Sequence, residues 1–81
     1  MPIMVNCVVE DVEEYEGKKG YGANILVSKL IDGKRKLLKF NISDQYMAVE
    51  LSRKLQKECV LTLELTQNDF GMRISRVIEV A

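Results

Sequence analysis

Histidine is absent from the 81-residue sequence. Its absence excludes Ser-His-Asp and Cys-His catalytic arrangements and any histidine-based zinc site. No apolar run approaches the roughly 18 to 20 residues of a membrane-spanning helix, and Met1-Pro2 is not followed by the basic and apolar segments of a secretory signal. We therefore expect a soluble cytoplasmic protein that is not an enzyme and uses no cofactor or metal.

Cysteine is scarce as well. Cys7 and Cys59 lie far apart in the sequence, form no C-x-x-C motif and sit in apolar, strand-like surroundings. We predict that both are reduced core residues, rather than a disulfide or a reactive thiol.

Net charge is also lacking, because 12 basic residues balance 12 acidic ones. The bulk electrostatic argument for a polyanionic partner is therefore missing. The charges are unevenly distributed, however. Acidic residues crowd Glu10 to Glu16, which we interpret as a solvated acidic turn rather than a metal site, whereas basic residues dominate Lys18 to Lys39. A local basic surface is compatible with this distribution.

The clearest structural pattern is a β-hairpin. Asp32-Gly33 separates two β-rich runs, Ala23 to Ile31 and Lys34 to Ile42. Both turn residues tolerate the positive φ angles of a two-residue primed turn. The flanking runs are therefore predicted to be antiparallel partners.

Further elements follow from the same kind of pattern. Alternation predicts a strand over Ile3 to Val12, with a bulge near Glu10-Asp11 where the register breaks. Glycines at 17, 20 and 22 predict a mobile loop from Tyr15 to Gly22. Ser43 or Asp44 is a candidate N-cap for a helix running to about Lys57.

The C-terminal third is predicted to be a second hairpin. Leu61, Leu63 and Leu65 face inward in a strand over Cys59 to Thr66, and turn-forming residues follow at 67–71. The last strand, Met72 to Val80, should place Ile74, Ile78 and Val80 inward. Arg76 falls on this same face unless a bulge intervenes.

This order of elements indicates one domain over residues 1–81 with an all-β fold and one helix. Five strands with a helix between strands three and four match the Greek-key barrel of the oligonucleotide/oligosaccharide-binding (OB) fold. An SH3-like barrel is the competing architecture, but it would normally lack such a helix at that point.

Candidate binding residues flank the central hairpin. The Gly17 to Gly20 segment has the G-x-x-G form of KH domains, yet it joins two strands rather than two helices, and no Ser or Thr follows Lys19 as in a P-loop. Lys18 and Lys19 could neutralise phosphates and Tyr21 could stack on a base, the alternative being a flexible solubilising loop.

Phe70 lies in a polar turn, where it either tucks onto the barrel or projects as a stacking or dimer-contact residue. In an OB barrel its loop and the first loop bracket the ligand face of strands two and three. Lys29, Arg35 and Lys39 lie in those strands. Tyr46 is interpreted as a packing residue.

Two segments resemble the gene V single-stranded-DNA-binding proteins of filamentous phages. Gly17-Lys18-Lys19-Gly20-Tyr21 is similar to that family's wing, and the segment from Phe70 to Val77 is similar to its Phe-Gly turn and final strand. The resemblance implies an OB-fold homodimer that coats single strands cooperatively. It also implies that Tyr21 stacks on bases, Lys18 and Lys19 meet phosphates, Phe70 reaches a base held mainly by the other subunit, and Arg76 lies along the DNA backbone.

The sequence therefore predicts a phage- or mobile-element-type protein that binds single-stranded DNA without sequence preference during replication. The predicted nucleic-acid-binding residues are Lys18, Lys19, Tyr21, Lys29, Arg35, Lys39, Phe70, Arg73 and Arg76. An OB module that docks a protein partner is the alternative from another class. An RNA-binding OB domain would differ only in the preferred polymer.

Overall fold

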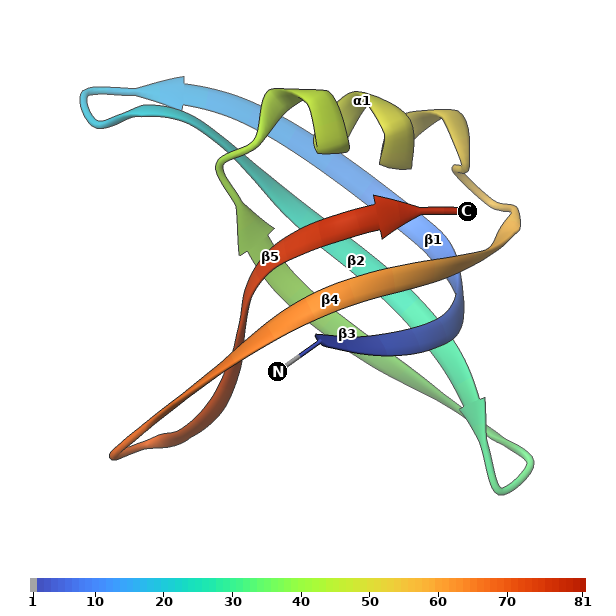
Figure 1. Cartoon of the computed structure of the whole chain (residues 1–81). Helices are drawn as coiled ribbons and strands as arrows, with labels where there is room; N and C mark the ends of the chain where they lie inside the picture. The colour runs from blue at the N-terminus through green and yellow to red at the C-terminus, as the bar shows by residue number, and fades with distance from the viewer. Residues whose placement is uncertain (1) are drawn as a thin grey trace.

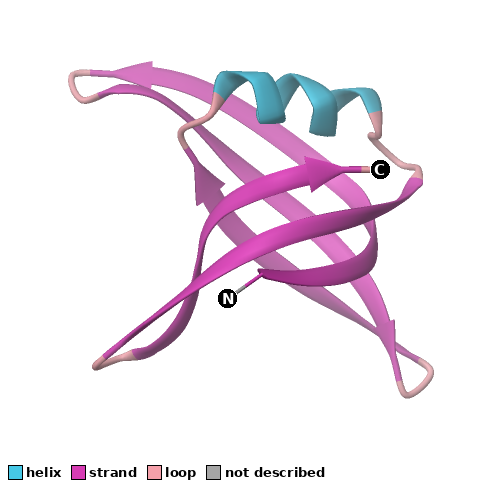
Figure 2. Cartoon of the chain, viewed as in Figure 1, coloured by secondary structure: helices cyan, strands magenta, loops and turns pink. Residues whose placement is uncertain are grey.

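Five strands and one helix make up the computed structural model, which describes residues 2–81 (Figures 1 and 2). Their bounds in chain order are β1 Pro2–Gly17, β2 Gly20–Ile31, β3 Lys34–Ile42, α1 Gln45–Arg53, β4 Glu58–Asn68 and β5 Gly71–Val80. The prediction of a mostly β chain with one helix is confirmed. Within residues 2–81, no helix is long and apolar enough to cross a membrane.

The strands form a single antiparallel sheet in the order β3-β2-β1-β4-β5. Its central strand, β1, pairs with β4 along its first half and with β2 along its second half. The register shifts between Val9 and Asp11, so Glu10 forms the predicted bulge. Such a bulge bends a strand and increases its twist. Accordingly, β1 curves from the β4–β5 side of the molecule to the β2–β3 side (Figure 1).

The predicted central hairpin is confirmed. Asp32 has a φ of 51° and Gly33 a φ of 77°, as a primed two-residue turn requires. Ile31 pairs with Lys34, and the pairing continues to Ala23 opposite Ile42. The turn chemistry therefore fixes the register of β2 against β3.

The predicted mobile loop from Tyr15 to Gly22 is wrong. Strand β1 continues to Gly17 and β2 starts at Gly20, so only Lys18 and Lys19 form the turn. Gly20 has a φ of 107°, which an L side chain would adopt only with strain. The glycines therefore fit a tight hairpin and its turn rather than a mobile loop.

Strand β5 departs from the simple alternation expected of it. Register shifts occur between Thr62 and Leu63 and between Glu64 and Leu65 of its partner β4. The extra residues on β5 turn Val77 into the core at 3% exposed and leave Ile78 36% exposed. The prediction that Ile78 points inward is therefore wrong. Because a bulge does intervene, Arg76 leaves the apolar face and pairs with Glu64.

Helix α1 begins as predicted but ends early. The carboxylate of Asp44 accepts hydrogen bonds from the backbone N–H groups of Tyr46 and Met47, which satisfies two of the free donors at the N-terminus. The helix ends at Arg53 rather than Lys57. The chain beyond it is held to β1, because the N–H of Gln56 donates to the carbonyl of Val9 at 2.7 Å. Tyr46 on this helix is 68% exposed, so its interpretation as a packing residue is wrong.

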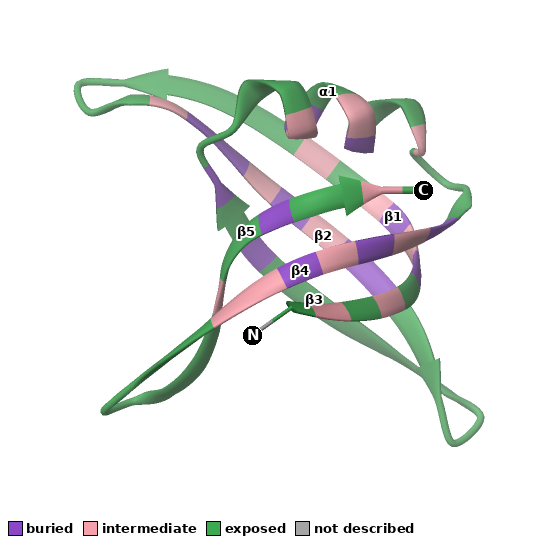
Figure 3. Ribbon diagram, in the orientation of Figure 1, coloured by how far each residue is buried: buried purple, intermediate pink, exposed green. Residues whose placement is uncertain are grey.

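The core lies between the curved sheet and α1 (Figure 3). It consists of Cys7, Val9, Ala23, Ile25, Val27, Phe40, Ile42, Ala48, Leu51, Cys59, Leu61, Leu63 and Val77. Burial of these side chains is the main force holding so small a sheet together. Both cysteines are buried and unpaired, as predicted.

Candidate nucleic-acid interface

A groove separates β3 from β5, the two edge strands of the sheet. It has a volume of about 800 Å³, and the described residues that line it come from β1, β3, β4, β5 and the residue after β3. Its apolar lining residues are Ile3, Val5, Leu38, Phe40, Ile42, Leu63, Leu65, Met72 and Ile74. The groove therefore combines apolar and polar surface in similar measure, and it has one sheet edge on each side.

Positive charge distinguishes this β3–β5 groove. Lys39 and Arg73 are the charged side chains among its described lining residues, and both are exposed. Asn41, Ser43 and Ser75 contribute neutral polar groups. A cationic groove with apolar and amide surfaces suits a ligand that combines anionic phosphates with flat bases. Two predicted binding residues from opposite edges of the sheet thus line one groove.

Phe70 lies at the tip of the β4–β5 hairpin, two residues before the groove-lining Met72. Its side chain is 99% exposed, so it projects from the turn and does not tuck onto the barrel. The turn itself is ordered locally, because the N–H of Phe70 donates to the side-chain oxygen of Asn68 at 2.8 Å and Gly71 takes a φ of 115°. The structure therefore presents an exposed aromatic ring at the tip of the hairpin that contributes Met72 and Arg73 to the groove.

The β1–β2 hairpin carries Lys18, Lys19 and Tyr21. Both lysines are exposed at the turn. Tyr21 is half-buried against the core, and its hydroxyl donates to a carboxylate oxygen of Glu14 at 2.8 Å. Burial, together with this hydrogen bond and the negative charge of Glu14, raises the pKa of Tyr21 to about 12. Tyr21 is therefore a neutral, anchored side chain rather than a fully projecting ring.

Arg35 takes part in a separate polar cluster. Its guanidinium donates to the hydroxyl of Ser28 at 2.7 Å and lies 3.9 Å from a carboxylate oxygen of Glu10. The Ser28 hydroxyl in turn donates to that same Glu10 oxygen at 2.7 Å. Ser28 is fully buried, so this arrangement satisfies a polar group that would otherwise be costly to bury.

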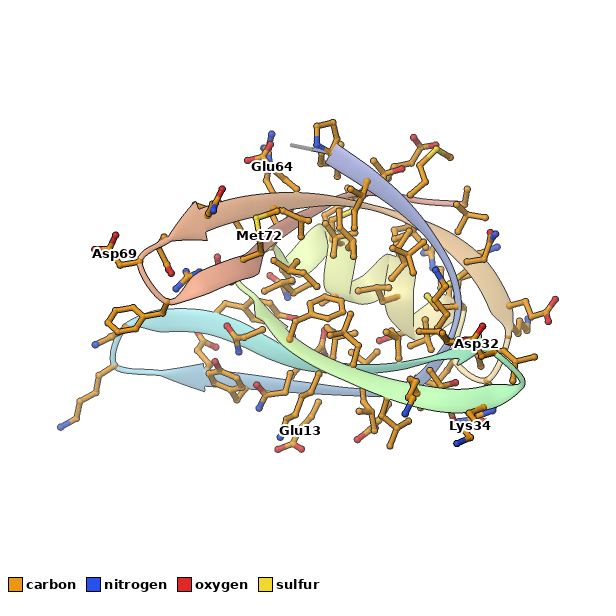
Figure 4. The ribbon with its side chains drawn as sticks, turned by 90° about the horizontal axis from the view of Figure 1, so that it is seen from below. Glu13, Asp32, Lys34, Glu64, Asp69 and Met72 are labelled. Atoms are coloured by element: carbon orange, nitrogen blue, oxygen red, sulfur yellow. The ribbon has the colours of Figure 1, made fainter. Side chains whose placement is uncertain are left out.

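Lys29 lines a second groove of about 540 Å³, together with Arg35, Glu58 and both cysteines. Arg76 lies on β5, where its guanidinium donates to a carboxylate oxygen of Glu64 at 3.1 Å. Glu64 points outward from β4 (Figure 4). The structure thus brings Lys39 and Arg73 together, whereas Lys29, Arg35, Phe70 and Arg76 are not among the residues that line the β3–β5 groove.

The acidic run is part of β1 rather than a turn, so its side chains alternate between the two faces of the sheet. Glu14 binds Tyr21 and Glu10 binds Ser28. Glu13 points away from the sheet on the opposite face from Glu14 (Figure 4). Among residues 2–81, no cluster of three or more His, Cys, Asp or Glu side chains could hold a metal ion.

Sequence reasoning did not identify Tyr15 and Asn41 as candidates. The side-chain nitrogen of Asn41 donates to the Tyr15 hydroxyl at 2.7 Å and to the side-chain oxygen of Asn24 at 3.0 Å. Asn41 also lines the β3–β5 groove. Extending the strand pairing of the central hairpin into the glycine-rich segment would have placed Tyr15 opposite Gly22 and revealed this contact.

Comparisons with protein-family models, with curated proteins and with solved structures found no match for this chain. The resemblance to gene V proteins therefore rests on the residues quoted above and stays a prediction.

Proposed function

We propose that this chain is an OB-type barrel that binds single-stranded DNA without sequence preference. The order of elements and the sheet order β3-β2-β1-β4-β5 support the fold assignment, because a curled five-stranded antiparallel sheet with a helix after the third strand has the composition of that barrel. The chain carries out no reaction in this proposal. It acts as a homodimer on replicating DNA of a phage or mobile element.

The observation that carries the binding proposal is the charge of the β3–β5 groove. Lys39 and Arg73 stand on its two edges, and the described residues that line it include no carboxylate. Phosphates can therefore contact a cation from either side while bases reach the apolar lining. Phe70 adds a fully projecting ring at the tip of the hairpin that carries Arg73.

The groove assignment can be tested by neutralising its two cations. A fluorescein-labelled dT oligonucleotide is titrated with wild type, with Lys39→Gln/Arg73→Gln and with the control Lys34→Gln/Lys57→Gln. The control removes the same charge from exposed positions that do not line the groove. Loss of affinity in the first variant alone supports the proposal. Equal affinities in all three proteins, or no binding by wild type at low salt, would contradict it.

A protein-docking module remains the second candidate, because β3 and β5 each have an unpaired edge beside an apolar surface. An extended peptide could add to such an edge by main-chain hydrogen bonding. This function predicts no oligonucleotide binding and a partner whose binding is lost on Phe70→Asp.

Competition between labelled dT, poly(U) and duplex DNA separates single-stranded DNA from the RNA alternative.

A further inference from the structure

Tyr15 lies over a glycine on the outer face of the sheet. Tyr15 of β1 is directly opposite Gly22 of β2. A Cβ atom added to Gly22 would lie 2.5 Å from the Cζ and the hydroxyl oxygen of Tyr15 and 2.8 Å from its Cε2. The ring therefore occupies the space that a side chain at position 22 would fill. Gly22 is buried although it lies on the outer face of the sheet, whereas Tyr15 remains 45% exposed.

The ring is held in this position from its far end. Asn41 of β3 donates to the Tyr15 hydroxyl at 2.7 Å, and the same nitrogen contacts Asn24 of β2 at 3.0 Å. The contacts thus join β1, β2 and β3. An aromatic ring fixed in this way loses little conformational freedom when a second ring stacks on it.

The position of the ring connects it to the proposed binding groove. Asn41 lines the β3–β5 groove, and Lys39 lies two residues earlier on the same face of β3. A polynucleotide that leaves the groove across β3 would pass Lys39 and Asn41 before reaching Tyr15. Cation, amide and ring therefore follow one another along a continuous surface.

We infer that Tyr15 is a stacking surface for an unpaired nucleobase, and that Gly22 and Asn41 position its ring. This inference rests on the proposed single-stranded DNA binding and adds a subsite outside the groove. Stacking of one base on an aromatic side chain changes affinity by about 5- to 150-fold. A purely structural role, in which the ring only covers the glycine, would leave DNA affinity unchanged.

Tyrosine fluorescence distinguishes these roles directly. The variant Tyr21→Phe/Tyr46→Phe retains Tyr15 as its tyrosine, and the control Tyr15→Phe/Tyr21→Phe retains Tyr46, which lies 68% exposed on α1. Each is titrated with poly(dT) at low salt, while the anisotropy of a labelled dT oligonucleotide confirms saturation. We expect strong quenching of Tyr15 and little change in Tyr46. Unchanged Tyr15 emission at saturation would overturn the inference.

Affinity measurements provide a second test. We expect Tyr15→Leu to weaken dT binding about 5- to 150-fold, and Tyr15→Phe to retain most of the affinity because the ring remains. Gly22→Ala should weaken binding by displacing the ring. Circular dichroism confirms that each variant is folded. If wild type binds and folded Tyr15→Leu binds equally well, only the stacking site is refuted. If wild type fails to bind, the proposed function and the stacking site both fail.

Discussion

Cys7 and Cys59 stand directly opposite each other on β1 and β4, each 5% exposed. Burial, followed by the neighbouring Cys59 thiol, raises the pKa of Cys7 to about 12, and burial raises the pKa of Cys59 as well. An ordinary thiol has a pKa of about 8.5. Above about pH 8.5, the Cys7 thiol therefore stays protonated in the folded protein while it ionises in the unfolded chain, and the raised pKa of Cys59 acts in the same direction.

Stability should consequently fall as the pH rises above about 8.5. Between that value and about 12, the unfolded chain releases the Cys7 proton while the folded protein keeps it, so ionisation favours unfolding. The expected loss is up to roughly 1.4 kcal/mol per pH unit for each such thiol. Urea unfolding at pH 8, 9 and 10 measures it. The variant Cys7→Ala/Cys59→Ala should show a flatter dependence, and an identical slope would refute this origin.

Neutralising the groove cations should change the salt dependence of binding as well as its strength. Each phosphate contact on a single strand contributes about −0.7 to the slope of log affinity against log salt. Lys39→Gln/Arg73→Gln should therefore reduce the magnitude of the slope by about 1.4. Titrations at several salt concentrations measure this change. A slope as steep as that of wild type would show that other residues meet the phosphates.

Phe70→Ala should weaken DNA binding without destabilising the fold. The side chain is 99% exposed, so its removal should change the free energy of unfolding by no more than about 0.5 kcal/mol. Loss of a stacked base should weaken DNA binding about 5- to 150-fold. Urea unfolding and oligonucleotide titration of the same preparation provide both values. Phe40→Ala is the matched control for stability. Removal of this core side chain should lower the free energy of unfolding by about 3 to 5 kcal/mol.

Glu13→Gln is expected to strengthen binding. Glu13 is paired with Asn24 in the β1–β2 register, so its carboxylate lies on the same outer face as the Asn24–Asn41–Tyr15 contacts. A negative charge there opposes a polyanion, and removing it should raise affinity several-fold at low salt, with a smaller gain at high salt. Glu79→Gln, on β5, is the control. Unchanged affinity in Glu13→Gln would place the DNA track elsewhere.

Sequence reasoning succeeded where local chemistry determines the structure. Asp32-Gly33 requires positive φ angles, and Asp44 caps a helix start, so both features are encoded within a few residues. The end of α1 could not be predicted in this way, because the contact of Gln56 with Val9 joins segments that are distant in sequence. The glycine-rich hairpin was misinterpreted for a similar reason, since cross-strand pairing outweighs the flexibility of individual glycines.

The candidate site was predictable by residue type but not by grouping. Lysine and arginine positions were evident, yet only the approach of β3 to β5 brings Lys39 and Arg73 to one groove. The bulge that turns Arg76 outward has only a partial local signature: Arg76 interrupts the apolar face of the last strand, but the sequence does not show which residues of β5 are added. A loop assignment for Tyr15 hides its contact with Asn41, because that contact depends on the pairing of β1 with β2 and of β2 with β3.

Phe40, Ile42 and Leu63 belong both to the hydrophobic core and to the lining of the β3–β5 groove. An occupant of the groove would therefore touch the same side chains that hold the two edges of the sheet in place. Ligand occupancy and thermal resistance should rise together, so a dye-based melting assay can serve as an unlabelled screen for whatever fills this groove.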